Sequence, residues 1–212
     1  MLSVIFDMDG TLFDTQRICI PAWDYAGEIQ GFSNVGKHIP AVCGMSDSGW
    51  KQYLRDNFPT MDIEKFSSEA RQYVVDNLVV KYMPGAEDLV RFLKEKGVKI
   101  AIASGSSQES IKHHLEEVGG AHYFDAIVGG SDIKNGKPAP DIFLLAAEKL
   151  GANPEDCYVL EDSPNGIRAG HAAGMKAIGI PDIAQFSDEI KALETKEFKS
   201  MFETLEYFKS MF

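Results

Sequence analysis

The sequence predicts an α/β protein with a doubly wound, mostly parallel sheet and a small inserted helical segment. Beyond Met83, short apolar runs alternate with amphipathic helical stretches, a pattern typical of a parallel sheet covered by helices. The first apolar run stops near Asp14, and the residues after it are helical in pattern, aromatic and interrupted by loops. We therefore expect a core domain of residues 1–14 and 84–212 and an inserted α-helical domain of residues 15–83.

Each expected element of the core has a local signal. Pro84 and Gly85 open a helix with one apolar face, and Gly97 closes it before the next apolar run. The remaining repeats predict five strands in all, separated by helices. The expected strands are residues 2–6, 98–103, 125–128, 157–160 and 176–180. Three later helices are expected: one with Ile111, Leu115 and Val118 on one face, one over residues 140–150, and one after Ser163.

The C-terminal segment has apolar residues at helical spacing. Met201, Leu205, Phe208 and Phe212 fall at positions i, i+4, i+7 and i+11. This spacing predicts a helix that docks on the core, and a helix that binds a partner remains the alternative.

The charge balance excludes polyanion binding as the main function. The chain has 21 Lys and Arg against 32 Asp and Glu, a formal net charge of −11, and its basic residues form no stripe. Such a field repels nucleic acid and acidic membrane surfaces. No uninterrupted apolar stretch approaches the roughly 20 residues needed to cross a bilayer. We expect a monomer with no nucleic-acid or membrane partner.

The cysteines indicate a reducing compartment. Cys19, Cys43 and Cys157 are odd in number and widely spaced, which fits reduced thiols rather than a disulfide framework or a zinc site. The first strand begins at Leu2 with no basic region or cleavage site before it, so nothing directs export. We expect a cytoplasmic protein.

The most informative stretch is residues 4–13, where an apolar run ends in two carboxylates, Asp7 and Asp9. Two anions at a strand end repel each other and are costly to desolvate, so they imply a cation between them. Strand alternation would place both carboxylates on the same side. One aspartate can attack covalently while the other gives and takes a proton. Gly10 allows an unusual turn, and Thr11 offers a hydroxyl.

This motif resembles the first motif of the haloacid dehalogenase-like (HAD) hydrolases, most of which are Mg²⁺-dependent phosphoryl-transfer enzymes. The resemblance implies that Asp7 is the nucleophile and Asp9 the general acid and base. It also implies a Mg²⁺ cofactor held by Asp7 and Asp9, the latter through its backbone carbonyl. We assign the Thr11 hydroxyl to substrate binding.

Three further strand ends carry polar motifs, at the edge where ligands of such sheets bind. Ser104 and Gly105 follow the second strand and present a hydroxyl and free N–H groups to an anion. Ser106 or Ser107 is expected to cap the following helix. In the resemblance, Ser104 holds a phosphoryl oxygen, and we assign Gly105 to the same substrate site.

The other two motifs carry one lysine and two acids. Lys137 lies in a proline-framed loop before a helix, and the resemblance implies that it neutralises the transferring phosphoryl group and steadies Asp7. Glu161 and Asp162 end a second apolar strand and resemble the motif whose acids hold the metal. On a continuing strand the two acids would point to opposite sides, so Asp162 is the favoured ligand and Glu161 the second candidate.

The position of the insertion resembles the small α-helical cap of the β-phosphoglucomutase-like subfamily. In that subfamily's sugar phosphomutases, the cap loop commonly offers an arginine for the second phosphate, whereas this chain has Asp47 after Ser46. An acid there repels a second phosphate. Both residues are candidates for substrate binding, although they also fit a helix cap.

We therefore predict a capped, Mg²⁺-dependent phosphatase of a small phosphorylated metabolite, for which a sugar phosphate is one candidate. The alternatives are a β-phosphoglucomutase-like sugar phosphomutase and, from another class, a non-catalytic metabolite-binding module. The cap aromatics Trp23, Tyr25, Trp50 and Tyr53 either line a sugar site or form the core of the cap. His38 is the one histidine with a claim on substrate.

Overall fold

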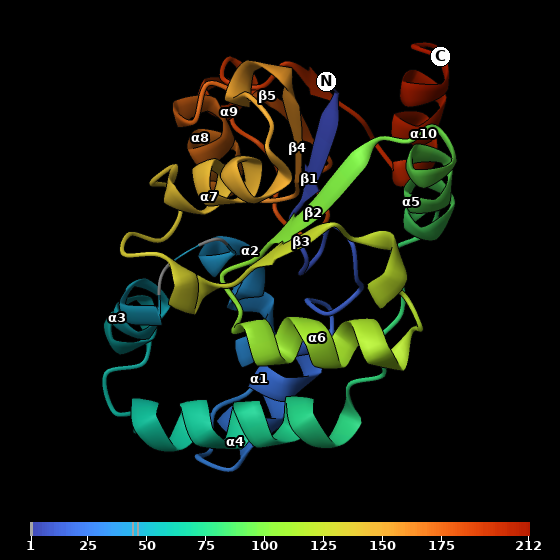
Figure 1. Cartoon of the computed structure of the whole chain (residues 1–212). Helices are drawn as coiled ribbons and strands as arrows, with labels where there is room; N and C mark the ends of the chain where they lie inside the picture. The colour runs from blue at the N-terminus through green and yellow to red at the C-terminus, as the bar shows by residue number, and fades with distance from the viewer. Residues whose placement is uncertain (1, 44, 46) are drawn as a thin grey trace. The chain divides into compact units, whose positions relative to one another are not determined.

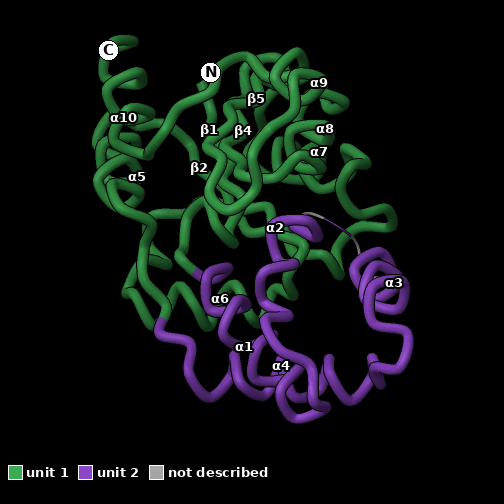
Figure 2. The backbone as a smooth tube through the Cα atoms, turned by 180° about the vertical axis from the view of Figure 1, so that it is seen from behind, with its two compact units in different colours: residues 1–14, 80–212 green, residues 15–79 purple. Residues whose placement is uncertain are grey.

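The computed structural model describes residues 2–43, 45 and 47–212, with the side chain of Asp47 outside that description. The chain divides into two compact units, residues 1–14 with 80–212 and residues 15–79, which Figure 2 shows in different colours. Each unit has buried apolar side chains of its own.

A parallel sheet forms the centre of the first unit (Figure 1). Its order, β3-β2-β1-β4-β5-β6, puts β1 between β2 and β4. The strand order therefore reverses at β1, and the carboxyl ends of β1, β2 and β4 lie side by side. The strands in the described part of the chain are β1 Ser3–Phe6, β2 Lys99–Ala103, β3 Ala126–Val128, β4 Cys157–Glu161, β5 Lys176–Gly179 and β6 Lys196–Glu197.

The predicted α/β class with a mostly parallel sheet is confirmed. The expected number of strands was wrong by one, because β6 pairs with β5 at the edge of the sheet. This strand consists of Lys196 and Glu197, both exposed, so it has no apolar run from which it could be predicted.

Helices cover both faces of the sheet (Figure 1). One face carries α5 Ala86–Glu95 and α10 Met201–Lys209, and the other carries α7 Asp141–Leu150 and α8 Pro164–Ala172. All four residues of β1 are buried, so both faces of this strand are covered. This is expected for a parallel sheet, whose two faces pack against the apolar faces of helices. The remaining helices of this unit are α6 Gln108–Glu117 and α9 Asp188–Lys191, with 3₁₀ turns at Ala121–Tyr123, Gly130–Asp132 and Pro154–Asp156.

The C-terminal helix α10 packs on α5, as a docking helix would. Met201, Leu205 and Phe208 are buried. The helix ends at Lys209, so Phe212 lies beyond it and is 55% exposed, with its ring 5.9 Å from the ring of Phe92. The predicted helical spacing therefore holds for three of its four residues.

The second unit is helical and has an aromatic core. Its elements are α1 Cys19–Glu28, a 3₁₀ turn at Val35–His38, α2 Ile39–Val42, α3 Asp47–Asn57 and α4 Ile63–Asn77. Trp23 of α1 lies between Trp50 and Phe66, with ring centroids 5.6 and 5.4 Å away, and is 8% exposed. These contacts place Trp23 in the core of its unit.

Other aromatic side chains of the second unit are less enclosed. Tyr25 is 45% exposed, and its ring lies 5.2 Å from the ring of Tyr73 at an interplanar angle of 40°. His38 Nδ1 is 2.8 Å from the Tyr53 hydroxyl, and partial burial, helped by the charge of Lys37, lowers the pKa of His38. His38 is thus held by a tyrosine of its own unit.

Two further expectations concern the whole chain. Among the described residues, no helix is both long and apolar enough to cross a membrane. The three cysteines are free thiols, and the buried Cys157 donates to the carbonyl of Asn153 at 3.3 Å.

Candidate active site

The loop after β1 is fixed by backbone hydrogen bonds. The N–H of Asp7 donates to the Leu160 carbonyl of β4 at 3.0 Å, which extends the pairing one residue past the strand. The Leu12 N–H then donates to the Met8 carbonyl, closing a tight turn. Gly10 has φ +83°, a conformation that glycine adopts without strain. Because the strand ends at Phe6, the alternation argument for Asp7 and Asp9 was wrong.

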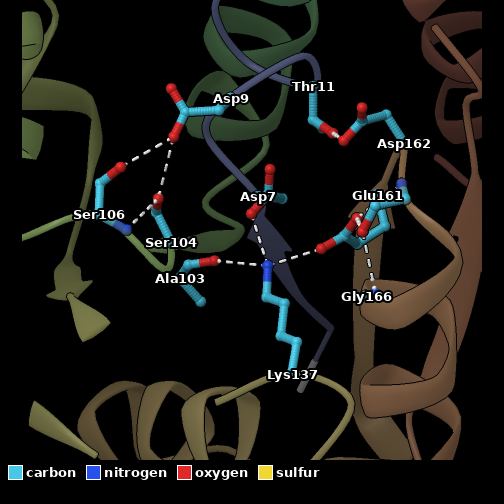
Figure 3. Close-up of polar contacts among 11 residues, drawn as sticks. Asp7, Asp9, Thr11, Ala103, Ser104, Ser106, Lys137, Glu161, Asp162 and Gly166 are labelled. Atoms are coloured by element: carbon cyan, nitrogen blue, oxygen red, sulfur yellow. Dashed lines mark hydrogen bonds and ion pairs between the residues drawn. The ribbon is translucent and has the colours of Figure 1, made fainter. Parts of the chain in front are cut away.

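The ammonium group of Lys137 joins the ends of three strands, β1, β2 and β4 (Figure 3). Its Nζ donates to Asp7 Oδ1 at 2.5 Å, to Glu161 Oε1 at 2.6 Å and to the Ala103 carbonyl at 3.2 Å. It also lies 4.9 Å from the ring centroid of Phe143. An ammonium has three N–H donors, and these three acceptors match them.

Three carboxylates gather beside this lysine. One oxygen each of Asp7, Glu161 and Asp162 lies within 4.8 Å of the others, and all three residues are buried. The expectation that Glu161 and Asp162 point to opposite sides was wrong, because β4 ends at Glu161 and alternation stops there. Thr11 Oγ1 donates to Asp162 Oδ1 at 3.2 Å, so its hydroxyl holds a carboxylate of this cluster.

Asp9 has separate partners at the end of β2. Figure 3 shows its carboxylate turned toward two serines: Ser106 Oγ donates to Asp9 Oδ2 at 3.0 Å and Ser104 Oγ at 3.3 Å. The N–H of Ser106 donates to Ser104 Oγ at 3.1 Å, which fixes the two hydroxyls relative to each other. The serines therefore hold Asp9 apart from the contact of Lys137 with Asp7.

Burial and like charges perturb the ionisation of the cluster. Burial raises the pKa of Asp7 from 3.8 to about 8; Lys137 opposes the rise, and Glu161 and Asp9 add to it. Burial likewise raises the pKa of Asp162 well above its usual value, with Glu161 and Asp7 adding to the effect. Burial alone would lower the pKa of Lys137, but the carboxylates of Asp7 and Glu161 outweigh it and keep the lysine charged.

The donor set fits a divalent cation. When ionised, the three carboxylates and one ammonium leave an excess of two negative charges (−3 and +1 sum to −2). Carboxylate oxygens are the ligands that Mg²⁺ prefers, and a divalent ion would remove the excess. Asp7 and Asp162 are the residues suited to hold such an ion. Both oxygens of Glu161 already accept hydrogen bonds, from Lys137 and Ser163.

The structure brings together Asp7, Asp9, Thr11, Ser104, Lys137, Glu161 and Asp162 from the predicted set (Figure 3). Gly105 lies in the same loop after β2 and is exposed. Ser46 lies outside the described residues, as does the side chain of Asp47. Their assignment to substrate binding stays a prediction.

The sequence analysis did not identify Ser106 and Ser163 as site residues. Ser106 donates to Asp9, whereas its neighbour Ser107 is the N-cap of α6 and accepts from the Ser110 N–H. Ser163 caps α8 and also donates to Glu161. The only signal for Ser163 was its position directly after the two acids.

Comparisons with known proteins place this arrangement in a family. The model of the family described as haloacid dehalogenase-like hydrolase matches residues 1–174. A phosphorylated carbohydrates phosphatase of Thermotoga maritima is 33% identical over 182 residues, which cover 84% of each chain. A bifunctional riboflavin kinase/FMN phosphatase of Arabidopsis thaliana is 46% identical over 191 residues, covering 85% of this chain and 48% of that protein.

Solved structures agree in fold. The β-phosphoglucomutase of Clostridium difficile superposes with a TM-score of 0.76 and 27% identity, covering 99% of this chain and 96% of that one. Because several curated relatives are phosphatases, the comparisons support the predicted phosphatase class. The predicted resemblance is confirmed: this chain belongs to the haloacid dehalogenase-like hydrolases.

Proposed function

We propose that this chain is a Mg²⁺-dependent phosphatase that hydrolyses a small phosphate monoester through an aspartyl-phosphate on Asp7. The observation that carries the proposal is the buried cluster in which Lys137 Nζ donates to both Asp7 and Glu161 while Asp162 lies within 4.8 Å. A buried carboxylate next to a fixed ammonium and a cation-binding donor set is suited to attack an anionic phosphorus centre.

The proposed first step uses Asp7 and Asp9. A carboxylate oxygen of Asp7 attacks phosphorus, and the bond from phosphorus to the alcohol oxygen breaks. The carboxyl of Asp9 gives its proton to that oxygen, so the alcohol leaves neutral. Lys137 stabilises the negative charge on the phosphoryl oxygens. Mg²⁺, held by Asp7 and Asp162, would supply further stabilisation of that charge.

The proposed second step restores the enzyme. The carboxylate of Asp9 takes a proton from water, whose oxygen attacks phosphorus, and the bond to Asp7 breaks. Inorganic phosphate leaves, and Asp9 carries the proton needed for the next cycle. The serine contacts of Asp9 support this division of roles, because Ser104 and Ser106 hold it apart from the lysine.

We further propose that residues 15–83 act as a cap domain for the core of residues 1–14 and 84–212. The support is the compact helical unit of residues 15–79, whose core of Trp23, Trp50 and Phe66 is its own. A cap of this kind excludes water while the phosphoryl group is transferred.

For the substrate, we propose a phosphate ester of a small polyhydroxylated molecule. The support is the activity of two relatives, one named for phosphorylated carbohydrates and one for FMN, whose phosphate is attached to a ribityl chain. A sugar phosphomutase is the second candidate, supported by the β-phosphoglucomutase structure. Asp47, in place of an arginine, argues against it.

A phosphate-release assay tests the proposal. Purified protein with Mg²⁺ is given FMN, fructose 1-phosphate and glucose 1-phosphate, the last also with a glucose bisphosphate primer. We expect inorganic phosphate from at least one monoester and none from the Asp7→Asn variant. No release from any ester, together with conversion of glucose 1-phosphate to glucose 6-phosphate, would establish the mutase instead.

A further inference from the structure

Glu161 is the most enclosed acid of the site, and its two oxygens have different partners. Oε1 accepts from Lys137 at 2.6 Å. Oε2 accepts from the Ser163 N–H at 3.0 Å and from the Ser163 hydroxyl at 2.9 Å. The side chain is 1% exposed. One carboxylate therefore connects the lysine to the first residues of α8.

The direction of the Ser163 hydroxyl follows from its second contact. The Gly166 N–H donates to Ser163 Oγ at 3.0 Å, as expected for a helix N-cap. That bond uses a lone pair of the oxygen, so the single hydroxyl proton remains for Glu161 Oε2. Capping and donation to the carboxylate are thus made by the same hydroxyl, and both leave Oε1 directed at Lys137.

The backbone of α8 closes the other side of the carboxylate. A Cβ placed on Gly166 would lie 1.8 Å from the Glu161 carboxylate carbon, so the carboxylate rests directly against the first helical turn. Glu161 has no room to turn toward the helix. Its orientation is set by Ser163 from one end and by the Gly166 backbone from the side.

We infer that Ser163 is a positioning residue that acts through Glu161 to hold Lys137 against Asp7. This inference rests on the proposed phosphatase function. The contacts form one chain, from the Gly166 N–H through Ser163 and Glu161 to Lys137 and Asp7. Loss of the hydroxyl leaves Glu161 Oε2 with the Ser163 N–H as its remaining partner from this residue, and so loosens the lysine that faces the phosphoryl group.

Kinetics separate this role from simple capping. Ser163→Ala should lower kcat by roughly 10- to 100-fold, the usual effect of losing a supporting hydrogen bond, with KM changed less than about threefold. Ser163→Thr keeps the hydroxyl and should restore kcat. Ser200→Ala, which removes the serine cap of another nine-residue helix, is the matched control and should lower Tm without changing kcat.

A second measurement needs no activity. In metal-free protein, the ¹⁵N signal of the Lys137 ammonium, assigned by its absence in Lys137→Arg, should exchange protons with water at least about tenfold faster in Ser163→Ala than in Ser163→Thr, because fewer fixed acceptors protect it. If Ser163→Ala matches Ser200→Ala in Tm loss and leaves kcat and the exchange rate unchanged, Ser163 is only a cap and the inference is wrong. If wild-type protein releases no phosphate but the exchange rates differ as stated, the positioning role stands and the proposed function fails.

Discussion

Lys137 Nζ lies 2.5 Å from Asp7 Oδ1, an ammonium directly on the carboxylate proposed to attack phosphorus. The side chains of the two residues are 13% and 10% exposed, so water screens the pair little. Such a lysine lowers the cost of bringing an anionic substrate to an anionic nucleophile.

Replacing Lys137 by alanine should lower kcat strongly at saturating substrate, by roughly 10²- to 10³-fold, because transition-state charge loses its partner. Lys149→Ala is the matched control, since Lys149 is an exposed lysine of α7 that donates to the Ile127 carbonyl. Steady-state kinetics of both variants test this. An effect confined to KM would contradict the role given to Lys137.

The Asp7→Asn variant should keep its fold and lose turnover. An amide keeps the shape of the carboxylate but is a far weaker nucleophile and metal ligand. Phosphate release and circular dichroism check both parts, with the exposed Asp88→Asn in the first turn of α5 as control. A tenth of wild-type activity remaining in Asp7→Asn would rule out the covalent mechanism.

Stability of the metal-free protein should depend on pH through Asp7. Its folded pKa of about 8 lies above the usual 3.8, so the folded state binds more protons than the unfolded state between these values. The free energy of unfolding should therefore fall as pH rises from 4 to 8, as measured by denaturant titration in chelator. Asp7→Asn should show a shallower fall, and an equal slope would contradict the assignment.

Mg²⁺ should restore activity after chelation, and Ca²⁺ should inhibit. The larger ion coordinates more loosely and would hold nucleophile and phosphoryl group at the wrong spacing. Phosphate release with each ion after dialysis against chelator measures both effects. Full activity in excess chelator would remove the metal from the proposal.

Asp47→Arg should improve binding of bisphosphorylated sugars. A close charge reversal contributes on the order of 1 to 3 kcal/mol, roughly 5- to 150-fold in affinity. Monophosphate hydrolysis should respond less, and added salt should weaken the contrast. Inhibition constants for a glucose bisphosphate compare the variant with wild type. A flat substrate profile with a small loss of stability would show that this residue only starts α3.

The sequence predicted the core of the fold because most of its strands and helices have a recognisable pattern within their own residues. Apolar runs such as residues 157–160 favour buried strands, and Gly85 and Gly97 mark the limits of α5. The parallel arrangement then brings Asp7 and Glu161 together from distant positions. By contrast, β6 depends on pairing with β5 and has no apolar signal of its own.

The details of the site depend on where strands stop. Both sequence arguments from alternation failed because the strands end too early. β1 ends at Phe6, before the two aspartates, and β4 ends at Glu161, before Asp162. The division of labour between Ser106 and Ser107 also follows from loop geometry, since two adjacent serines before a helix have the same local pattern. Tertiary contacts decide which one reaches Asp9.

The place of β1 in the sheet has a consequence for how the protein is made. Ser3 pairs with Lys99 on one side and with Cys157 on the other. β1 is therefore synthesised before both of the strands that pair with it, and its pairing is complete only after β4 has been synthesised. Until β4 arrives, β1 has an open, apolar edge that invites pairing with other chains. Nascent chains that stop before residue 157 are therefore expected to be both inactive and prone to aggregate.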